Sequence, residues 1–309
     1  MTDQAGTIAG IAGGALWRAL RPHQWVKNAL LLVPLLLAHR ALSEPARLGA
    51  ALLAAGCFCA VASAGYLLND WLDRESDRKH PSKRKRPLAS GALSPRLAAA
   101  AFALLLAAGF GAALALLPPR FAGLLALYLA LTTAYSLDLK RRVIVDVLAL
   151  AALYTLRILA GGTAAAVPIS PWLLEFSMFF FLSLALVKRY AELVAAARAR
   201  DREVLTGRGY HVEDLTLIPA MGLASAFASI LVIGLWASSP DVLALYRAPT
   251  LLWLACPVLF HWLMRMWLRA HRGRLDTDPV LFAATDPASY AAGALLVAIG
   301  VAASRGLGA

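Results

Sequence analysis

Long uninterrupted apolar runs dominate this 309-residue sequence, and most charged residues lie in the segments between them. A membrane-spanning helix needs about 20 mostly apolar residues, or about 17 at the short end. Nine runs qualify, at residues 24–40, 48–69, 97–117, 120–138, 143–160, 171–187, 215–237, 248–268 and 287–304. Membrane barrels are excluded because their strands alternate apolar and polar positions. The pattern therefore predicts an all-α integral membrane protein with nine transmembrane helices in one bundle.

The run lengths also predict the domain organisation. No internal repeat is evident, so we expect one transmembrane domain over residues 1–309. Residues 1–20 are interrupted by glycines and lack the basic n-region and apolar h-region of a secretory signal peptide. We expect them to form a poorly ordered or interfacial N-terminal segment.

Composition supports a membrane protein and excludes other classes. Hydrophobic residues make up 60% of the chain and charged residues only 16%, against about 45–50% and about 25% in ordinary soluble domains. The net charge of +12 does not indicate a nucleic-acid partner, because such a partner would not require long uncharged runs. The three cysteines lie within apolar runs and predict no disulfide framework.

The basic residues predict an orientation. Of the 30 Lys and Arg residues, 24 lie in the N-terminal segment or near the loops after the even-numbered runs, five lie on the other side, and Arg157 lies within the fifth run. By the positive-inside rule, the N-terminus and the even-numbered loops are cytoplasmic.

An acidic motif follows the second run. Asp70, Asp73 and Asp77 have the spacing i, i+3, i+7, which places them on one face if the helix continues. Hard oxygen ligands of this kind suit Mg²⁺, which shares its shell with water and substrate phosphates. The alternative is a solvated acidic face paired with the cations at residues 74, 78 and 79.

A dense basic run, which contains Lys83 and Arg86, comes directly after the acidic motif. Topology and anionic headgroups account for part of this charge. A metal-bound diphosphate would also need cations to contact the oxygens that the metal leaves free. The two adjacent motifs thus indicate a diphosphate site.

The residues Asn-Asp-x-x-Asp-x-x-x-Asp at 69–77, followed by Lys-Arg-Lys-Arg-Pro-Leu-Ala-Ser-Gly at 83–91, resemble the first signature of the UbiA superfamily of intramembrane prenyltransferases. The resemblance implies nine helices with the active site at the cytoplasmic loops, and a multi-pass enzyme of the bacterial cytoplasmic (inner) membrane. It also implies a Mg²⁺ cofactor held by Asp70, Asp73 and Asp77, with Asn69 as a neutral ligand.

Further segments are similar to the decaprenyl-phosphate phosphoribosyltransferase branch of that superfamily. They lie at residues 20–28, 135–140, 156–162 and 188–192, together with Asp146. In that branch phosphoribosyl pyrophosphate is the donor and a polyprenyl phosphate is the acceptor. The acceptor is already an anion, so the reaction requires no strong general base.

The loop after the sixth run departs from the wider superfamily. Ordinary members carry a second aspartate-rich motif there, whereas this chain reads Lys188-Arg189-Tyr190-Ala191-Glu192. Phosphoribosyl pyrophosphate carries a 5-phosphate besides its diphosphate, so more cations are expected. The alternative is that Lys188 and Arg189 only anchor the end of the helix at the interface.

Two other ionisable groups are candidates by position. Asp146 lies near the start of the fifth run, where a charge is costly and a functional role is the default expectation. We expect it to pair with Lys140 or a metal-bound water. Lys27 lies at the predicted cytoplasmic mouth and can contact phosphate. We therefore predict as catalytic residues Asp70, Asp73, Asp77, Lys140 and Asp146, and as substrate-binding residues Lys27, Asn28, Lys83, Arg86, Tyr135, Lys188, Arg189 and Glu192.

Two other functions compete with phosphoribosyl transfer. The first is a prenyltransferase that moves a polyprenyl group from its diphosphate to an aromatic or other lipophilic acceptor, but this chemistry needs the second acidic motif and a base for the ring proton. The second is a transporter or structural membrane protein whose acidic face is merely solvated, which broken helices near the midplane would favour. The charges here lie at the predicted cytoplasmic ends instead.

Overall fold

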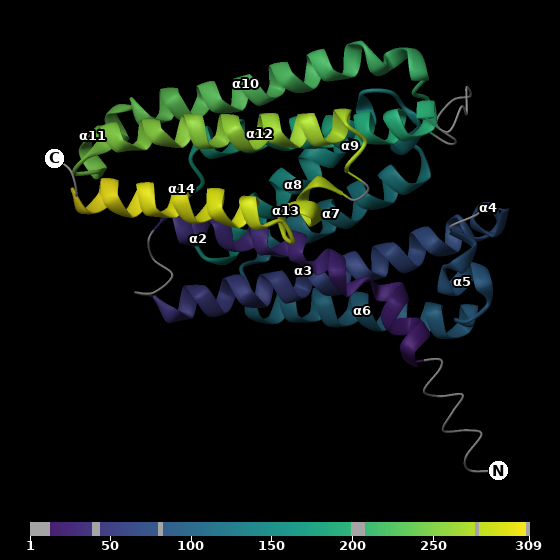
Figure 1. The fold of residues 1–309 in the computed structure, drawn as a ribbon. Coiled ribbons are helices and arrows are strands. Elements are labelled where there is room, and N and C mark those ends of the chain that lie inside the picture. Colours follow the sequence, from purple (N-terminus) through teal and green to yellow (C-terminus); the bar gives the residue numbers. More distant parts are fainter. Residues whose placement is uncertain (1–12, 39–43, 80–82, 199–207, 276–277, 307–309) are drawn as a thin grey trace. The chain divides into compact units, whose positions relative to one another are not determined.

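The computed structural model describes residues 13–38, 44–79, 83–198, 208–275 and 278–306. The described residues form helices and turns and contain no strand, as the ribbon in Figure 1 shows. The expectation of an all-α protein is therefore confirmed. Internal packing divides the chain into two compact units, Met1–Leu137 with Leu156–Pro168, and Asp138–Thr155 with Ile169–Ala309. A single domain over residues 1–309 stays a prediction.

The first unit is assembled around one long helix. Residues 13–20 are helical. The elements that follow are η1 (Pro22–Leu32), α2 (Val33–Leu37), α3 (Pro45–Leu72), α4 (Arg74–Lys79), η2 (Lys83–Lys85), α5 (Pro87–Ser90), α6 (Pro95–Leu116) and α7 (Pro119–Leu137). Helix α3 packs against α6, α7 and η1.

Small residues let the helices of the first unit approach closely. A Cβ atom at Gly161 would lie 2.0 Å from the backbone oxygen of Leu31, so η1 rests directly on the backbone of α8 (Val145–Ala164) at this glycine. A Cβ atom at Gly109 on α6 would lie 2.9 Å from the Val61 side chain on α3. Glycine at these positions permits the dense packing that holds helices together in a membrane.

The second unit contains the remaining elements. They are η3 (Leu139–Arg141), the first half of α8, α9 (Pro171–Arg198), η4 (Val212–Leu215), α10 (Leu217–Ala237), α11 (Pro240–Leu245), η5 (Pro249–Leu254), α12 (Ala255–His271), α13 (Pro279–Ala283) and α14 (Pro287–Arg305). Helix α9 packs against α10 and α12, and α12 packs against α14. Between these helices, Trp267 donates to the Ser183 hydroxyl at 3.1 Å, and Ser183 donates to the Gly222 carbonyl at 2.9 Å.

Proline marks the start of most of the long helices. The first residues of α3, α6, α7, α9 and α14 are all prolines. Proline is well suited to the first helical turn, because its missing N–H is not needed there and its φ is already helical. Side-chain caps reinforce two starts, since Ser94 accepts from the Leu97 amide and Asp286 accepts from the Ser289 amide.

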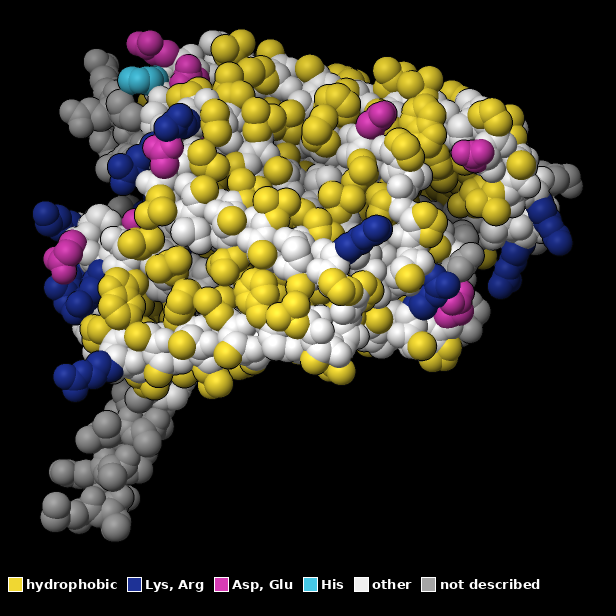
Figure 2. All heavy atoms as spheres, turned by 180° about the vertical axis from the view of Figure 1, so that it is seen from behind, with side chains coloured by type: hydrophobic (Ala, Val, Ile, Leu, Met, Phe, Trp, Pro, Cys, Tyr) yellow, Lys and Arg dark blue, Asp and Glu magenta, His cyan; other side chains and the backbone are white. Residues whose placement is uncertain are grey.

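Eight helices in the described part of the chain are long and apolar enough to cross a membrane. They correspond to the second through ninth predicted runs. The first run differs, because residues 22–32 form the 3₁₀ helix η1 and a separate short helix, α2, follows. Pro34 in the first turn of α2 has no backbone N–H, which breaks a continuous α-helical ladder at this point. Apolar side chains cover much of the face in Figure 2, as expected where lipid replaces water.

Helix α9 corrects one expected boundary. The sixth run was predicted to end at residue 187 and to pass into a charged loop, but α9 continues to Arg198. Lys188, Arg189 and Glu192 therefore lie on a helix. Alanine and other good helix formers dominate residues 191–198, so the backbone stays helical after the apolar run ends.

Candidate active site

The acidic motif of the first unit lies where α3 ends and α4 begins. Asp70 is in the last turn of α3, Asp73 is the C-cap, and Asp77 is in α4. The condition for a shared face, a helix that continues through all three aspartates, is therefore not met, because α3 stops at Leu72. Asp70 and Asp77 are nevertheless brought together and are each only 2% exposed, whereas Asp73 is half-buried.

Arginine side chains compensate the two buried carboxylates. Nη1 of Arg86 lies 3.1 Å from Oδ1 of Asp70 and 2.7 Å from Oδ2 of Asp77. Arg21 donates to the same Asp70 oxygen, and its guanidinium lies over the Tyr66 ring. Arg86 was predicted to bind substrate, and in the structure it bridges the acidic motif. The basic segment thus neutralises part of the acidic motif directly.

The geometry of this cluster bears on the expected metal. Two carboxylates from different helices converge on one positively charged group, so hard oxygen donors are available at a single point for a cation. Asp70 and Asp77 thus fit a divalent cation as ligands. Among the described residues, however, no three His, Cys, Asp or Glu side chains are arranged to hold a metal ion. A three-carboxylate site that includes Asp73, and Asn69 as a fourth ligand, stays a prediction.

A buried polar cluster in the first unit involves Asn28. Its amide oxygen accepts from Nε of Arg157 at 2.9 Å, and Nη2 of Arg157 donates to the Tyr128 hydroxyl at 2.9 Å. Arg157 is 5% exposed, and its guanidinium also lies over the Tyr128 ring. In the structure Asn28 therefore positions an arginine within the first unit, and its role in substrate binding stays a prediction.

The other predicted residues of the first unit lie at its surface or are half-buried. Lys27 is half-buried on η1, Tyr135 is half-buried on α7, and Lys83 is exposed at the start of η2. Each makes a polar or ring contact within the structure. Nothing in their positions assigns them to substrate, so these three stay predictions.

In the second unit, Asp146 is the centre of a fully buried network. Asp146 and Arg189 are both 0% exposed, and Nη2 of Arg189 lies 2.7 Å from Oδ2 of Asp146. The Tyr210 hydroxyl donates to Oδ1 of Asp146 at 2.6 Å and accepts from the Ile144 amide at 2.9 Å. The sequence suggested Lys140 or a metal-bound water as the partner of Asp146; the structure pairs it with Arg189 and Tyr210.

Tyr210 has the protonation state that this network needs. Burial and the hydrogen bond to the Asp146 carboxylate raise the pKa of its hydroxyl well above the ordinary value. The hydroxyl therefore stays protonated and donates to the carboxylate throughout the neutral range. A neutral donor and an arginine together stabilise the charge of Asp146 away from water.

The network continues outward through Glu192. Arg189 donates to Glu192 one turn along α9, and Nε of Arg208 lies 3.7 Å from the same carboxylate. Because Arg189 is completely buried, the interpretation of this residue as an interfacial anchor is wrong. Its position among Asp146, Tyr210 and Glu192 indicates that it holds the ends of α8 and α9 together.

Lys188 lies on the wall of a pocket of about 430 Å³ beside α9. Its ammonium contacts Oδ2 of Asp278 at 3.0 Å, and the Tyr154 hydroxyl donates to Oδ1 of that carboxylate at 3.2 Å. The pocket lining brings together two cations and two carboxylates with small and apolar side chains: Lys188, Arg198, Glu192, Asp278, Ala191, Ala195, Gly273 and Leu275. This polar pocket is large enough for a phosphorylated sugar fragment.

Several residues of these clusters could not be selected from the sequence. Arg21 lies far along the chain from Asp70, and Tyr210 lies far from Asp146. Asp278 follows Asp276 by two positions, and two acidic residues at this spacing in a loop are a weak signal of function. The pairing of Asp278 with Lys188 depends on how α13 packs against α9, and no local pattern carries that information.

Comparison with known proteins now identifies the family. The sequence matches the UbiA prenyltransferase family over residues 29–284. The first signature at 69–77 and 83–91 lies within that range. The chain therefore belongs to the UbiA prenyltransferase family and is a membrane-embedded transferase with several apolar spans.

Curated relatives resemble this chain over most of its length. A protein of Sinorhizobium fredii named uncharacterized protein y4nM is 44% identical over 90% of this chain, which spans about half, 53%, of that protein. Nodulation protein NoeC of Azorhizobium caulinodans is 38% identical over 88% of this chain and 87% of its own. Decaprenyl-phosphate phosphoribosyltransferase of Mycobacterium tuberculosis is 35% identical over 77% of this chain and 76% of its own.

Solved structures resemble the fold. A UbiA homolog from Archaeoglobus fulgidus, bound to DMAPP and Mg²⁺, has a TM-score of 0.65 at 17% identity. The match covers 94% of this chain and 99% of that one. The predicted resemblance to the UbiA superfamily is therefore confirmed at the level of fold and family.

Proposed function

We propose that this protein transfers a phosphoribosyl group from phosphoribosyl pyrophosphate to a polyprenyl phosphate and releases diphosphate. The observation that carries the proposal is the composition of the last part of α9, where Lys188, Arg189 and Arg198 accompany a single carboxylate, Glu192. Lys188 and Arg198 line a pocket beside α9. In an ordinary prenyltransferase of this superfamily, the second aspartate-rich motif would lie in this part of the chain. The similarity to decaprenyl-phosphate phosphoribosyltransferases supports the same donor and acceptor.

The first unit supplies the groups for the leaving diphosphate. Asp70, Asp73 and Asp77, with Asn69, are the residues that would hold Mg²⁺, and the bound cation would neutralise charge on the diphosphate. The exposed cations of the basic segment, such as Lys83, can contact phosphate oxygens. Arg86 and Arg21 hold the carboxylates in position in this cluster.

The bond changes need little acid–base chemistry from the protein. The C1–O bond to diphosphate breaks, the ribosyl carbon gains oxocarbenium character, and an oxygen of the lipid phosphate attacks it. That oxygen is already anionic, so no residue needs to remove a proton. Electrostatic stabilisation of the leaving group is then the main catalytic contribution.

The proposal includes a topology with nine crossings. A 3₁₀ helix rises about 2.0 Å and an α-helix about 1.5 Å per residue, so η1 and α2 together extend over roughly 30 Å, the thickness of the hydrocarbon core. The segment Pro22–Leu37 can thus span the bilayer although it is not one continuous α-helix. We place the N-terminus and the loops rich in Lys and Arg in the cytoplasm.

A transfer assay tests the proposed reaction. Membranes that contain the full chain are incubated with labelled phosphoribosyl pyrophosphate and polyprenyl phosphate, with and without Mg²⁺. Label is expected to enter the lipid only with Mg²⁺, and Asp73→Asn is expected to reduce turnover at least a hundredfold with unchanged expression. The matched control is Glu75→Gln, an exposed acidic residue of the same segment. Transfer only from a prenyl diphosphate to an aromatic acceptor would instead support the prenyltransferase alternative.

A second variant tests the pocket beside α9. Lys188→Gln removes one charge-assisted contact to phosphate, so the KM for the donor should rise about tenfold or more, with a smaller change in kcat. Arg120→Gln, at an exposed position in the first turn of α7, is the control for loss of one positive charge. An unchanged donor KM would show that Lys188 has a structural role with Asp278.

A further inference from the structure

The second unit contains another pocket besides the one that Lys188 lines. It has a volume of about 410 Å³ and is lined by one continuous stretch of α12 and the turn that follows. Its lining combines apolar residues with four arginines and one histidine: Phe260, Met264, Leu268, Arg265, Arg269, Arg272, Arg274 and His261. It shares no lining residue with the pocket beside Lys188.

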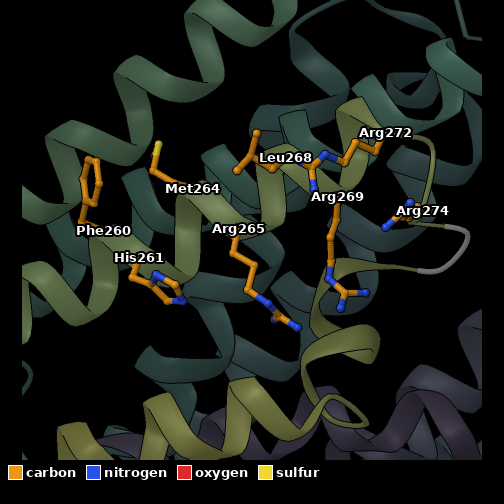
Figure 3. A pocket seen from close by; sticks show the side chains of 8 residues that line it. All are labelled: Phe260, His261, Met264, Arg265, Leu268, Arg269, Arg272 and Arg274. Carbon is orange, nitrogen blue, oxygen red and sulfur yellow. The ribbon is translucent and has the colours of Figure 1, made fainter.

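The side chains form two parallel rows along α12. Phe260, Met264 and Leu268 follow the spacing i, i+4, i+8 on one row, and Arg272 continues that row by one further turn. Figure 3 shows this apolar row beside a second row of His261, Arg265 and Arg269. A row of this kind is about 12 Å long from the first to the third apolar residue. The pocket therefore has an apolar row with basic side chains beside it and two further arginines, Arg272 and Arg274, at one end.

The arginines of the second row are held in place by one carboxylate. Arg265 makes two hydrogen bonds to Asp286, at 2.6 and 2.7 Å. Nη2 of Arg269 lies 3.9 Å from the same carboxylate, and its guanidinium lies over the Phe282 ring. Asp286 is also the N-cap of α14. Its single negative charge leaves a large positive excess around the pocket.

The remaining two arginines are exposed. Neither Arg272 nor Arg274 makes an ion pair with a described residue, and both flank Gly273, whose φ of +64° creates the turn after α12. The apolar row is exposed too, because Phe260 is 44% and Leu268 51% accessible. In a helix that spans a bilayer, exposed apolar side chains face lipid.

We propose that this pocket binds an anionic phospholipid, with an acyl chain along Phe260, Met264 and Leu268 and the phosphate headgroup at Arg272 and Arg274. The charge excess selects an anion, and basic pockets at the cytoplasmic end of membrane helices suit anionic headgroups. This assignment is independent of the transferase reaction.

Lipid binding to the purified full-length protein tests the proposal. The detergent-solubilised, delipidated protein is titrated with phosphatidylglycerol or phosphatidylcholine, and bound lipid is counted by native mass spectrometry. We expect one phosphatidylglycerol to bind in preference to phosphatidylcholine. The double variant Arg272→Gln with Arg274→Gln should bind phosphatidylglycerol about 30-fold more weakly. Each basic residue near an anionic headgroup contributes about 1 kcal/mol of binding free energy, and the loss of two such residues corresponds to this change in affinity.

Matched controls separate this site from general charge effects. Arg120→Gln with Arg305→Gln removes two exposed arginines elsewhere and should leave the affinity unchanged. Leu268→Gln keeps the charge but shortens the apolar row, and should weaken binding about threefold to tenfold. Equal binding of the two lipids, or an unchanged affinity in the Arg272/Arg274 variant, would overturn the proposal.

Two further results would assign the pocket to another ligand. If millimolar inorganic phosphate displaced the lipid and Leu268→Gln had no effect, the pocket would be a site for free phosphate. If polyprenyl phosphate bound more tightly than phosphatidylglycerol in the same titration, the pocket would belong to an acceptor lipid. Either result would contradict a resident phospholipid.

Discussion

Arg86 lies between two carboxylates from different helices, Asp70 and Asp77, both of which are almost fully buried. Two buried like charges repel each other strongly unless a cation compensates them. Arg86 supplies that compensation with one nitrogen atom, and Arg21 adds a second contact to Asp70. Without Arg86, the two carboxylates would lack this compensating cation, so the effect of a metal ion on them should become measurable.

Arg86→Gln is expected to lower the free energy of unfolding by about 2–3 kcal/mol, since one buried carboxylate loses its partner and another keeps only Arg21. Millimolar Mg²⁺ should restore more thermal stability in this variant than in the wild-type protein, because the carboxylates lose a competing cation. The control is Arg84→Gln, an exposed arginine two residues away. The measurement is a thermal shift in detergent with and without Mg²⁺; no Mg²⁺ effect in either protein would argue against a metal at these carboxylates.

Among the elements, α14 shows how one capping residue joins two helices. Asp286 caps the first turn of α14 and binds Arg265 of α12 through two hydrogen bonds. The Arg265 guanidinium holds the pKa of Asp286 well below its usual range. The native pKa is lower than the unfolded value of about 3.9, so the stability gain is present above that pH and is lost as the pH falls through the native pKa.

Asp286→Asn keeps a capping side chain but removes the charge, so it isolates the ion pair. We expect it to reduce stability by roughly 2 kcal/mol at pH 7. The loss of stability relative to the wild-type protein should be the same at pH 5 as at pH 7, because the Asp286 carboxyl of the folded protein is ionised at both pH values. Thermal unfolding in detergent measures this, with the exposed Asp241→Asn as control. A difference that disappeared by pH 5 would mean that the carboxyl is not held ionised.

For the whole molecule, the distribution of charge predicts how the chain crosses the membrane. Most basic residues lie near one set of loops, and eight helices of the described chain are suitable spans. The positive-inside rule, which depends on the Lys and Arg residues of short loops, predicts the orientation. On this prediction, the acidic motif and the charged end of α9 both face the cytoplasm.

Single cysteines at Ser76 and Ser170 test this orientation. Both serines are exposed, the first on α4 and the second just before α9. In a background without the three native cysteines, Ser76→Cys should react with a membrane-impermeant maleimide only in inverted vesicles. Ser170→Cys should react in intact cells. The opposite labelling pattern would reverse the topology.

Much of the fold and part of the site follow from local sequence patterns. Apolar runs of membrane length predict eight of the helices, since lipid requires every backbone polar group to bond within a helix. The spacing of Asp70 and Asp77 places them near each other even though α3 ends between them. These features depend only on residues close together in the chain.

The partners of the charged residues were decided by tertiary structure. Arg21 and Asp70 are 49 positions apart, and Tyr210 and Asp146 are 64 apart. Helical periodicity gives the face on which a side chain lies, but the helix that packs against it depends on the whole set of interhelical contacts. Because local patterns are sufficient for features of this kind, the sequence alone determined an all-helical membrane transferase with an acidic motif followed by a basic one. Only the packed structure assigned Arg86 to the carboxylates, Arg189 to Asp146, and the arginines of α12 to a pocket of their own.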